Sequence, residues 1–455
     1  MTCGHDSCGA AVSRRRILQG SAALAGTGAF MAAHPQSAFA ATGTPATGPA
    51  AASHHDFAPS GAYLAMAQST ADWIISHRSE DSYGAFFPAD PANPGRFFMA
   101  GSAPESFYCG MAGMIVTFAE LAQRTGEARY RDAAIAGAER LLKRWPEIAA
   151  APTPVLDMRW GMTFGISGIG MALYQVGTML GEPRYTAVLG QIADRIVAAA
   201  DHSNPKGTWT EYAGYLTDAS TALFLLQAAK ILNRDDYLRT AIRAGDRFIS
   251  LATQETDGSL AWRRPHNPAL PHLFYPGFEY GQAGTVYAIA SIYEASREPR
   301  FLDAAKRGTQ HLMNLAVGNG EAALLPYALP DHPDIFYLGF CHGAAGTARL
   351  FYKLHQLTGE RIYLDWTMRL ANGILAAGAP ELESPGMWNT VTQCCGVASF
   401  VTLFLGLWAS YGNPEHLEIA RRSARTISSR ANNLDGRGNK WFMAWSRVDP
   451  NIVNT

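Results

Sequence analysis

The sequence predicts an all-α fold, an α/α toroid built from six to seven hairpins of outer and inner helices. Three observations lead to this prediction. A turn followed by an aromatic residue recurs roughly every 52 to 64 residues. Each turn separates a strongly apolar run from an amphipathic run, and the apolar runs open with a turn of small residues. Repeats of this kind indicate stacked helical hairpins in which neighbours bury one another's apolar faces.

The recurring turn ends one helix and begins the next. It occurs at Gly126–Tyr130, Gly181–Tyr185, Asn233–Tyr237, Arg297–Phe301, Gly359–Tyr363 and Gly412–His416. Gly after a helix and Pro at the start of the following one are the residues favoured at these places. The runs before the turns are apolar on every side and indicate buried inner helices. The runs after the turns mix charged and apolar residues at helical spacing and indicate outer helices with one exposed face.

The small-residue turns predict where the functional end of the toroid lies. They occur at 109–113, 164–168, 280–284, 342–346 and 395–399, with a degenerate copy at 215–218. Glycine permits close approach of the backbone and unusual dihedral angles. Because outer and inner helices alternate, all inner helices start at one end of the ring. We therefore expect the residues just before the glycine turns to line a single mouth.

The first 40 residues predict a twin-arginine signal peptide. Arg14 and Arg15 precede an apolar run over 20–33 and a small-residue cleavage site at 38–40. The apolar run is shorter than the roughly 20 residues of a membrane anchor. We expect residues 1–40 to be the signal peptide, 41–58 a flexible linker and 59–455 a single toroid domain. The mature protein should then be secreted or periplasmic, without a stable membrane span, after meeting the twin-arginine translocase during export.

The net charge and the positions of the cysteines limit which kinds of function the protein can have. The formal net charge is −1 at pH 7, which argues against binding to nucleic acid or to an anionic membrane. The chain has six cysteines, and Cys3 and Cys8 lie in the predicted leader. Four cysteines in a large exported domain do not make a disulfide framework. A local metal site is the better interpretation.

Three cysteines precede the glycine turns of two successive repeats, so we predict that Cys341, Cys394 and Cys395 bind a metal. Cysteine is a usual zinc ligand, and helix N-termini favour the thiolate. Zinc would take water or substrate in the fourth position, with Cu(I) as the rival metal. The alternative is that these are buried structural cysteines. Cys109 occupies the matching place in the first repeat and is a fourth ligand, a reactive thiol or a packed apolar residue.

These motifs resemble those of the lanthionine synthetase C-like proteins. The resemblance extends over nearly the whole mature chain and rests on the glycine-turn repeats, on Phe340–Gly343 and on Cys394–Gly396. It implies a zinc enzyme of the cyclase type that adds a thiol to a dehydroamino acid. It also implies a peptide or small-molecule substrate, and zinc ligands at Cys341, Cys394 and Cys395.

The residues that transfer protons in that family are replaced here. The family's catalytic His falls on Tyr280, and an Arg before the first zinc ligand is Tyr337. The Tyr after that ligand is His342, and the family's acidic residue falls on Glu211. We expect His342, Glu211 and Tyr280 to form a different acid/base set. Glu279 is an additional candidate.

Two other functions stay open at this stage. A secreted carbohydrate-active enzyme would use paired carboxylates. The candidates for such a pair are Asp157, Glu211, Glu279, Asp331 and Asp334. A non-catalytic metal or peptide binder would keep the fold without the chemistry. Fold alone does not decide between these functions, whereas zinc held by cysteine would favour the cyclase type.

Overall fold

The computed structural model describes residues 61–91, 104–108, 110–152, 157–201, 208–210, 212–263, 272–382, 384 and 387–441. The predicted signal peptide (1–40) and linker (41–58) lie outside these residues. Within the described residues the chain forms thirteen helices and eight short strands. The helices are α2 (Gly61–Ser76), α3 (Met111–Thr125), α4 (Ala128–Ala150), α5 (Ile166–Leu180), α6 (Pro183–Ala199), α7 (Asp218–Leu232), α8 (Asp235–Ser250), α9 (Gln282–Ser296), α10 (Pro299–Leu315), α11 (Ala344–Thr358), α12 (Arg361–Ala376), α13 (Val397–Tyr411) and α14 (Pro414–Ser429).

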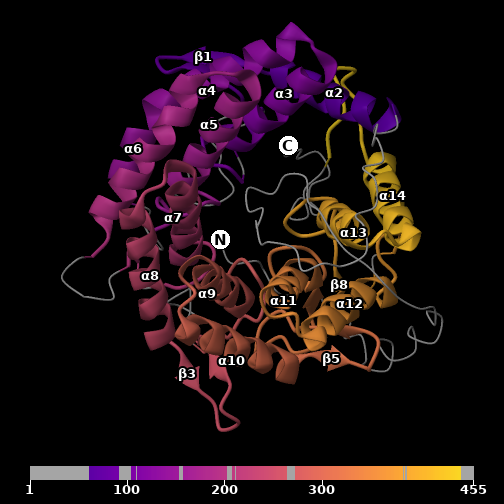
Figure 1. Ribbon diagram of the computed structural model, residues 1–455. Helices are drawn as coiled ribbons and strands as arrows, with labels where there is room; N and C mark the ends of the chain where they lie inside the picture. Colours follow the sequence, from indigo (N-terminus) through magenta and orange to yellow (C-terminus); the bar gives the residue numbers. More distant parts are fainter. Residues whose placement is uncertain are drawn as a thin grey trace.

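The helices form two concentric rings, which confirms the predicted α/α toroid (Figure 1). Helices α3, α5, α7, α9, α11 and α13 form the inner ring, and α4, α6, α8, α10, α12 and α14 form the outer ring. Each inner helix packs against the outer helix that follows it in the sequence. In the described part of the chain, no helix combines the length and the apolar character needed to cross a bilayer.

The predicted turns lie between the inner and outer helices of each hairpin. Each inner helix is 15 residues long and ends at a residue in the left-handed conformation. These residues are Gly126, Gly181, Asn233, Arg297, Gly359 and Gly412. Glycine is favoured there because it has no Cβ to clash in that conformation. Pro183, Pro299 and Pro414 open the outer helices α6, α10 and α14, as the sequence predicted.

The aromatic residue of the repeat joins neighbouring outer helices in three of the hairpins. It is the third residue of its outer helix and is buried in every repeat. The hydroxyl of Tyr185 donates to Glu139 on α4 (2.7 Å), and that of Tyr237 donates to Asp194 on α6 (2.7 Å). The hydroxyl of Tyr130 donates in the same way to Asp72 on α2 (3.2 Å). Helix α2 therefore takes the place of an outer helix before α4.

A glycine lies directly before most of the inner helices. A Cβ on Gly281 would lie 1.9 Å from the carbonyl oxygen of Tyr275, and a Cβ on Gly396 would lie 1.9 Å from that of Thr390. The backbone N–H of Gln282 donates to the same Tyr275 oxygen (2.9 Å). Any side chain would hold the loop away from the helix, so glycine is required for this close approach.

The strands pair in twos, and one pair bears on the candidate site. They are β1 (Ser79–Asp81), β2 (Gly84–Phe86), β3 (Thr253–Gln254), β4 (Leu260–Ala261), β5 (Val317–Gly318), β6 (Ala323–Leu324), β7 (Phe336–Tyr337) and β8 (Met387–Trp388). Strands β7 and β8 are parallel neighbours, whereas the other three pairs are antiparallel. Because β7 leads to Cys341 and β8 leads to Cys394, this pairing brings the two cysteine loops together.

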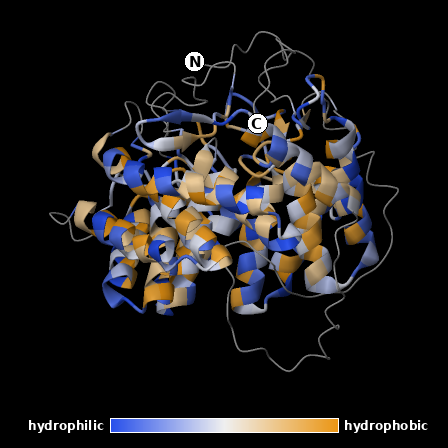
Figure 2. Cartoon of the chain, turned by 90° about the horizontal axis from the view of Figure 1, so that it is seen from above, coloured by the Kyte–Doolittle hydropathy of each residue, from blue (hydrophilic) through white to orange (hydrophobic). Residues whose placement is uncertain are grey.

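The core lies mainly between the two rings. Helix α7 is buried on every side from Asp218 to Leu226, whereas α8 buries one face through Tyr237, Thr240, Ala241, Ala244, Gly245 and Phe248. That spacing is the helical period expected for an element with one exposed face. Hydrophilic and hydrophobic residues accordingly alternate along the helices in the view of Figure 2. The predicted difference between a buried inner helix and an outer helix with one exposed face is therefore confirmed for the α7–α8 hairpin.

The ring closes where the segment after α14 meets α2. The indole of Trp73 on α2 donates to the carboxylate of Asp435 (2.9 Å), and Lys440 donates to the same carboxylate (2.6 Å). The backbone N–H of Asn439 donates to the hydroxyl of Ser69 on α2 (3.1 Å). Polar contacts therefore join the two ends of the described chain.

Candidate metal centre

The loops that precede the inner helices supply the candidate site. The residue two positions before the N-cap of each inner helix is Tyr108, Thr163, Tyr215, Glu279, Cys341 or Cys394. We call these six residues the rim set. Each occupies the same position in its own repeat, just before an inner helix. All six therefore lie at the end of the toroid where the inner helices begin.

Hydrogen bonds join five members of the rim set in series. The backbone N–H of Tyr108 donates to the carbonyl of Thr163 (3.0 Å), and the hydroxyl of Thr163 donates to Glu279 Oε1 (2.6 Å). The N–H of Glu279 donates to the carbonyl of Cys341 (2.6 Å), whose own N–H donates to the carbonyl of Cys394 (3.0 Å). Five separate repeats are thereby tied together at the mouth.

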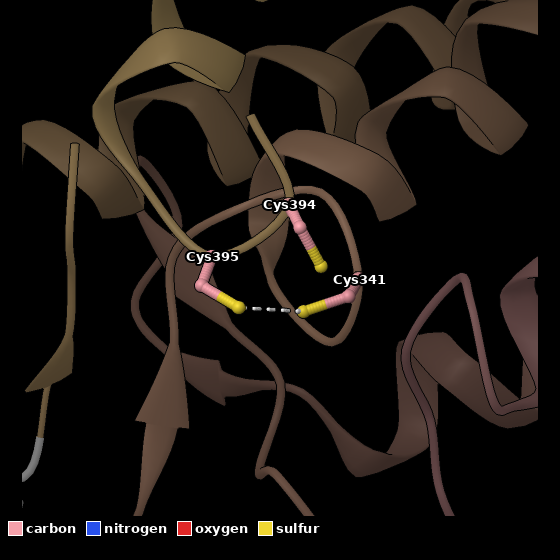
Figure 3. Close-up of side chains that lie close together, drawn as sticks. All are labelled: Cys341, Cys394 and Cys395. Carbon is pink, nitrogen blue, oxygen red and sulfur yellow. Dashed lines mark hydrogen bonds between the residues drawn. The ribbon is translucent and has the colours of Figure 1, made fainter. Parts of the chain in front are cut away.

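The three predicted ligand cysteines converge on one point (Figure 3). Their Sγ atoms all lie within 4.8 Å of one another. The Sγ atoms of Cys341 and Cys395 are 3.6 Å apart, which is far longer than the roughly 2.05 Å of a disulfide bond. Cys341 and Cys395 are buried and Cys394 is partly exposed. The hydroxyl of Thr392 accepts from the N–H of Cys395 (3.1 Å) and fixes the turn that carries both neighbouring cysteines.

Burial and mutual proximity make these thiols resist ionisation. Burial raises the pKa of Cys341 well above its usual range, and hydrogen bonds to Cys394 and Cys395 raise it further. A hydrogen bond from Cys341 lowers the pKa of Cys394, but the hydrogen bond to Cys395 and burial outweigh it, so that pKa is also raised. Three thiolates cannot coexist at these positions unless a cation compensates their charge.

The donor set fits a zinc ion. Zinc prefers sulfur and nitrogen ligands in a tetrahedral arrangement, and Zn–S bonds of about 2.3 Å place the sulfurs about 3.8 Å apart. The observed separation of 3.6 Å between Cys341 and Cys395 is close to that value. Three cysteines would leave one of four positions for water or a substrate thiol. No other group of three metal-binding side chains lies this close together among the described residues.

A buried carboxyl group lies beside the cysteines. Glu279 is 5 % exposed, and its Oε1 accepts from the hydroxyl of Thr163. Burial and the charge of Cys394 raise the pKa of Glu279 to about 8, against the lowering effect of Thr163. Glu279 is therefore mostly protonated near neutral pH.

His342 lies in a cage of aromatic rings next to the cysteines. Its ring is stacked on Tyr280, with centroids 4.8 Å apart and planes 5° apart. Tyr327 and Tyr337 contact it edge-on, at centroid distances of 4.9 Å and 5.3 Å. Burial raises the pKa of Tyr280 well above its usual range, and so does the charge of Glu279. The structure thus brings together four of the residues that the sequence suggested, His342, Tyr280, Tyr337 and Glu279.

The predicted site residues and the observed ones differ at four positions. Cys109 and Glu211 lie outside the described residues. Tyr108 and Thr163 were missed, although they belong to the same series of hydrogen bonds as Glu279. The signal that would have found them is their position, because each stands two residues before an N-cap glycine, as Cys341 does.

Two of the carboxylates considered for a carbohydrate-active site have basic partners of their own. Asp157 forms an ion pair with Arg159 (2.8 Å), and Asp331 forms one with His272 (2.7 Å). Both pairs are partly exposed, in contrast to Glu279. Glu279 is thus a buried carboxyl group beside the cysteine sulfurs, and Asp157 and Asp331 are engaged with basic residues instead of pairing with it.

Comparisons with known proteins cover a family model and several solved structures. The chain matches the family model described as lanthionine synthetase C-like protein over residues 101–441. Among solved structures it is similar to nisin cyclase, with a TM-score of 0.54 and 12% identity over 75% of this chain and 85% of that chain. A D-mannose isomerase gives a TM-score of 0.47 and 14% identity over 83% of this chain and 100% of that chain. The α-1,6-mannanase of Salegentibacter sp. HEL1_6 gives a TM-score of 0.43 and 14% identity over 81% of this chain and 87% of that chain.

The likeness to nisin cyclase shows a shared toroid fold, since the sequence identity is too low to carry more. The family match includes the six inner helices and the three cysteine positions. The chain therefore belongs to the lanthionine synthetase C-like protein family.

Proposed function

We propose that this chain is a zinc-dependent enzyme of the cyclase type, which activates a thiol for addition to an unsaturated acceptor in a peptide or small molecule. The observation that carries the proposal is the convergence of three cysteine sulfurs, within 4.8 Å of one another, at the mouth of the toroid. Zinc, when bound, would supply the positive charge that stabilises a thiolate near neutral pH.

The surrounding residues support this chemistry by holding protons close to the sulfurs. Thiol addition forms a C–S bond and leaves the neighbouring carbon in need of a proton. Glu279 retains its proton near neutral pH and lies beside Cys394, so it is suited to the role of general acid. His342, stacked on Tyr280, is suited to take the proton of the incoming thiol. Glu211 stays a candidate for the same set from the sequence alone.

An addition assay tests this proposal. Residues 41–455, loaded with zinc, should convert a dehydroalanine-containing peptide and a small thiol into the thioether, measured by mass spectrometry. Cys341→Ser, Cys394→Ser and Cys395→Ser should each lower the rate at least about 100-fold, because a site with only three protein ligands holds zinc poorly when one of them is lost. Asp157→Asn and Asp331→Asn serve as controls and should keep the wild-type rate.

The result also separates the competing functions. Wild-type protein that binds zinc but forms no thioether would favour a non-catalytic binder. A glycosidic activity that is lost in Asp157→Asn or Asp331→Asn and kept in the cysteine variants would favour the carbohydrate-active enzyme. Either result would refute the proposed addition chemistry.

We further propose that the protein is exported by the twin-arginine route and acts outside the cytoplasm. The support is the order of Arg14 and Arg15, the apolar run and the small-residue cleavage site in the sequence. A fusion of residues 1–40 to a reporter that folds in the cytoplasm should appear outside the inner membrane. Replacement of both Arg14 and Arg15 by Lys should block that export, and unchanged export would contradict the route.

A further inference from the structure

Arg349 on the inner helix α11 carries a charge that no described residue balances. It is the first residue of α11 that is not buried, since residues 344–348 are all buried. Its guanidinium lies over the ring of Phe340, 5.0 Å from the centroid. Among the described residues, no carboxylate pairs with its side chain and no hydrogen bond reaches it. The ring face leaves all five N–H donors of the guanidinium without an acceptor from these residues.

The next cation on the same helix shows how the protein balances a charge in this region. Lys353 lies one turn after Arg349, and its ammonium is 5.9 Å from the centroid of the Tyr287 ring on α9. Lys353 is buried and pairs with Glu294 on α9 (2.5 Å). Removing a charge from water costs free energy unless a counter-ion compensates it. Lys353 has its counter-ion in the protein, whereas the absence of one at Arg349 leaves a place for an anionic ligand.

The surroundings of Arg349 are aromatic and adjoin the cysteine loops. The ring of Phe340 lies 5.0 Å from that of Phe278 and meets that of Tyr215 edge-on at 6.1 Å. Phe340 is also the residue before Cys341, so one residue links the guanidinium to the cysteine sulfurs. Side chains in a helix lean toward its N-terminus, which directs Arg349 toward the end of the toroid where the sulfurs lie. An anion held by Arg349 would therefore lie beside aromatic rings, where low polarity strengthens the attraction between charges.

We propose that Arg349 binds a carboxylate of the thiol substrate, so that the site takes a thiol acid in preference to a neutral thiol. This inference rests on the proposed function, because it names the class of thiol that the same site would accept. A planar guanidinium matches a carboxylate with two parallel hydrogen bonds, and the Phe340 ring holds its plane in place. Arg349 would fix one end of the small molecule while its thiol lies at the cysteine sulfurs.

A matched pair of thiols tests this assignment. 3-Mercaptopropionate and 3-mercaptopropionamide have the same length and nearly the same shape, but only the first is charged. Each is titrated into the zinc-loaded protein by isothermal titration calorimetry, for wild type, Arg349→Gln, Arg349→Lys and Arg297→Gln. Arg297 is the matched control, because its guanidinium also lies over an aromatic ring, that of Tyr293 (5.8 Å). It stands at the C-cap of α9, however, at the opposite end of the inner ring from the cysteines.

Wild type should bind the acid about 10-fold more tightly than the amide, because only the acid forms charge-assisted hydrogen bonds with Arg349. Arg349→Gln should bind both thiols equally, Arg349→Lys should keep part of the preference, and Arg297→Gln should keep all of it. Equal binding by wild type, an undiminished preference in Arg349→Gln or an equal loss in Arg297→Gln would overturn the role of Arg349 and leave the thiol site intact. A wild-type protein that binds neither thiol would overturn the proposed function, and this inference with it.

Stability without any ligand separates a binding role of Arg349 from a structural one. Arg349→Gln removes no ion pair, so its denaturant midpoint should stay close to that of wild type. Lys353→Gln should lower the midpoint, because it leaves Glu294 without its counter-ion. A drop in Arg349→Gln as large as that in Lys353→Gln would identify Arg349 as a structural residue and contradict the assignment. The comparison of acid with amide in wild type needs no variant, so it decides the question even if Arg349→Gln folds poorly.

Discussion

Burial controls the protonation of the individual residues at the mouth. Glu279 and Cys341 are both buried and both have raised pKa values, but the raised pKa has a different consequence for each residue. A neutral Glu279 is able to give up a proton, whereas a neutral Cys341 has to lose one before it can bind a metal. Metal binding at this centre should therefore release protons and weaken as the pH falls.

The stability of the fold should depend on the protonation of Asp218, the first residue of α7. Burial raises its pKa to about 6, against hydrogen bonds from Thr210 that lower it. A carboxyl with a higher pKa in the folded state stabilises the protein fully below its unfolded pKa of about 4. That contribution is lost as the pH rises through about 6.

The Asp218→Asn variant tests this dependence, since its amide does not titrate. The free energy of unfolding of wild type relative to Asp218→Asn should fall between pH 4 and pH 7, by on the order of 2 kcal/mol. Denaturant unfolding of both proteins across this range measures the difference. A difference that does not change with pH would show that Asp218 titrates normally in the fold.

Single residues also mark the limit of prediction from sequence. Cys341, Cys394 and Cys395 could be assigned to one site because cysteine before a glycine turn is distinctive and repeats in two hairpins. Tyr108 and Thr163 occupy the same position in their repeats, but tyrosine and threonine are common in loops and carry no such signal. Their roles depend on hydrogen bonds between loops that are distant in sequence, which the chain order alone does not reveal.

At the scale of elements, the glycine turns decide how closely each loop lies against its inner helix. The sequence predicted these turns, since a small residue recurs before each apolar run. It did not predict which loops pair with which, because the parallel pairing of β7 with β8 involves only two residues in each strand. So short a pairing has no recognisable alternation of apolar residues.

Gly281→Ala tests the importance of this close approach. The new Cβ would lie 1.9 Å from the carbonyl oxygen of Tyr275, so either the loop or α9 must move. We expect a loss of more than about 2 kcal/mol in the free energy of unfolding, measured with denaturant. Gly320→Ala is the matched control, because a Cβ there has no atom within 4 Å, and it should be close to neutral. Equal stability of the two variants would refute a steric requirement at Gly281.

At the scale of the whole molecule, the ring closes through polar contacts around Asp435. Its carboxylate accepts from Lys440 and Trp73, and the hydrogen bond from Lys440 is the main reason for its lowered pKa. A lowered pKa means that this contribution to stability is present above the unfolded pKa and is lost as the pH falls through the folded one. The repeat pattern predicted a closed ring, but the closing contacts come from residues outside the repeats.

Asp435→Asn should loosen this closure without disturbing the hairpins. Loss of the charged acceptor should cost about 1 kcal/mol and expose the segment after α14 to limited proteolysis, which mass spectrometry can locate. Asp365→Asn changes an exposed carboxylate that pairs with Arg361 on the same helix, α12, and it should leave the cleavage pattern unchanged. Identical patterns for Asp435→Asn and wild type would mean that other contacts close the ring.

The metal content of the whole protein tests the central claim most directly. Protein purified without chelators should contain about one zinc per chain, and Cys394→Ala should contain almost none. Ser429→Ala, at the end of α14, should keep the wild-type content and so control for handling. Only the cysteine variant should lose its zinc. Zinc that stays bound in Cys394→Ala, or metal absent from every protein including wild type, would contradict a functional centre built from Cys341, Cys394 and Cys395.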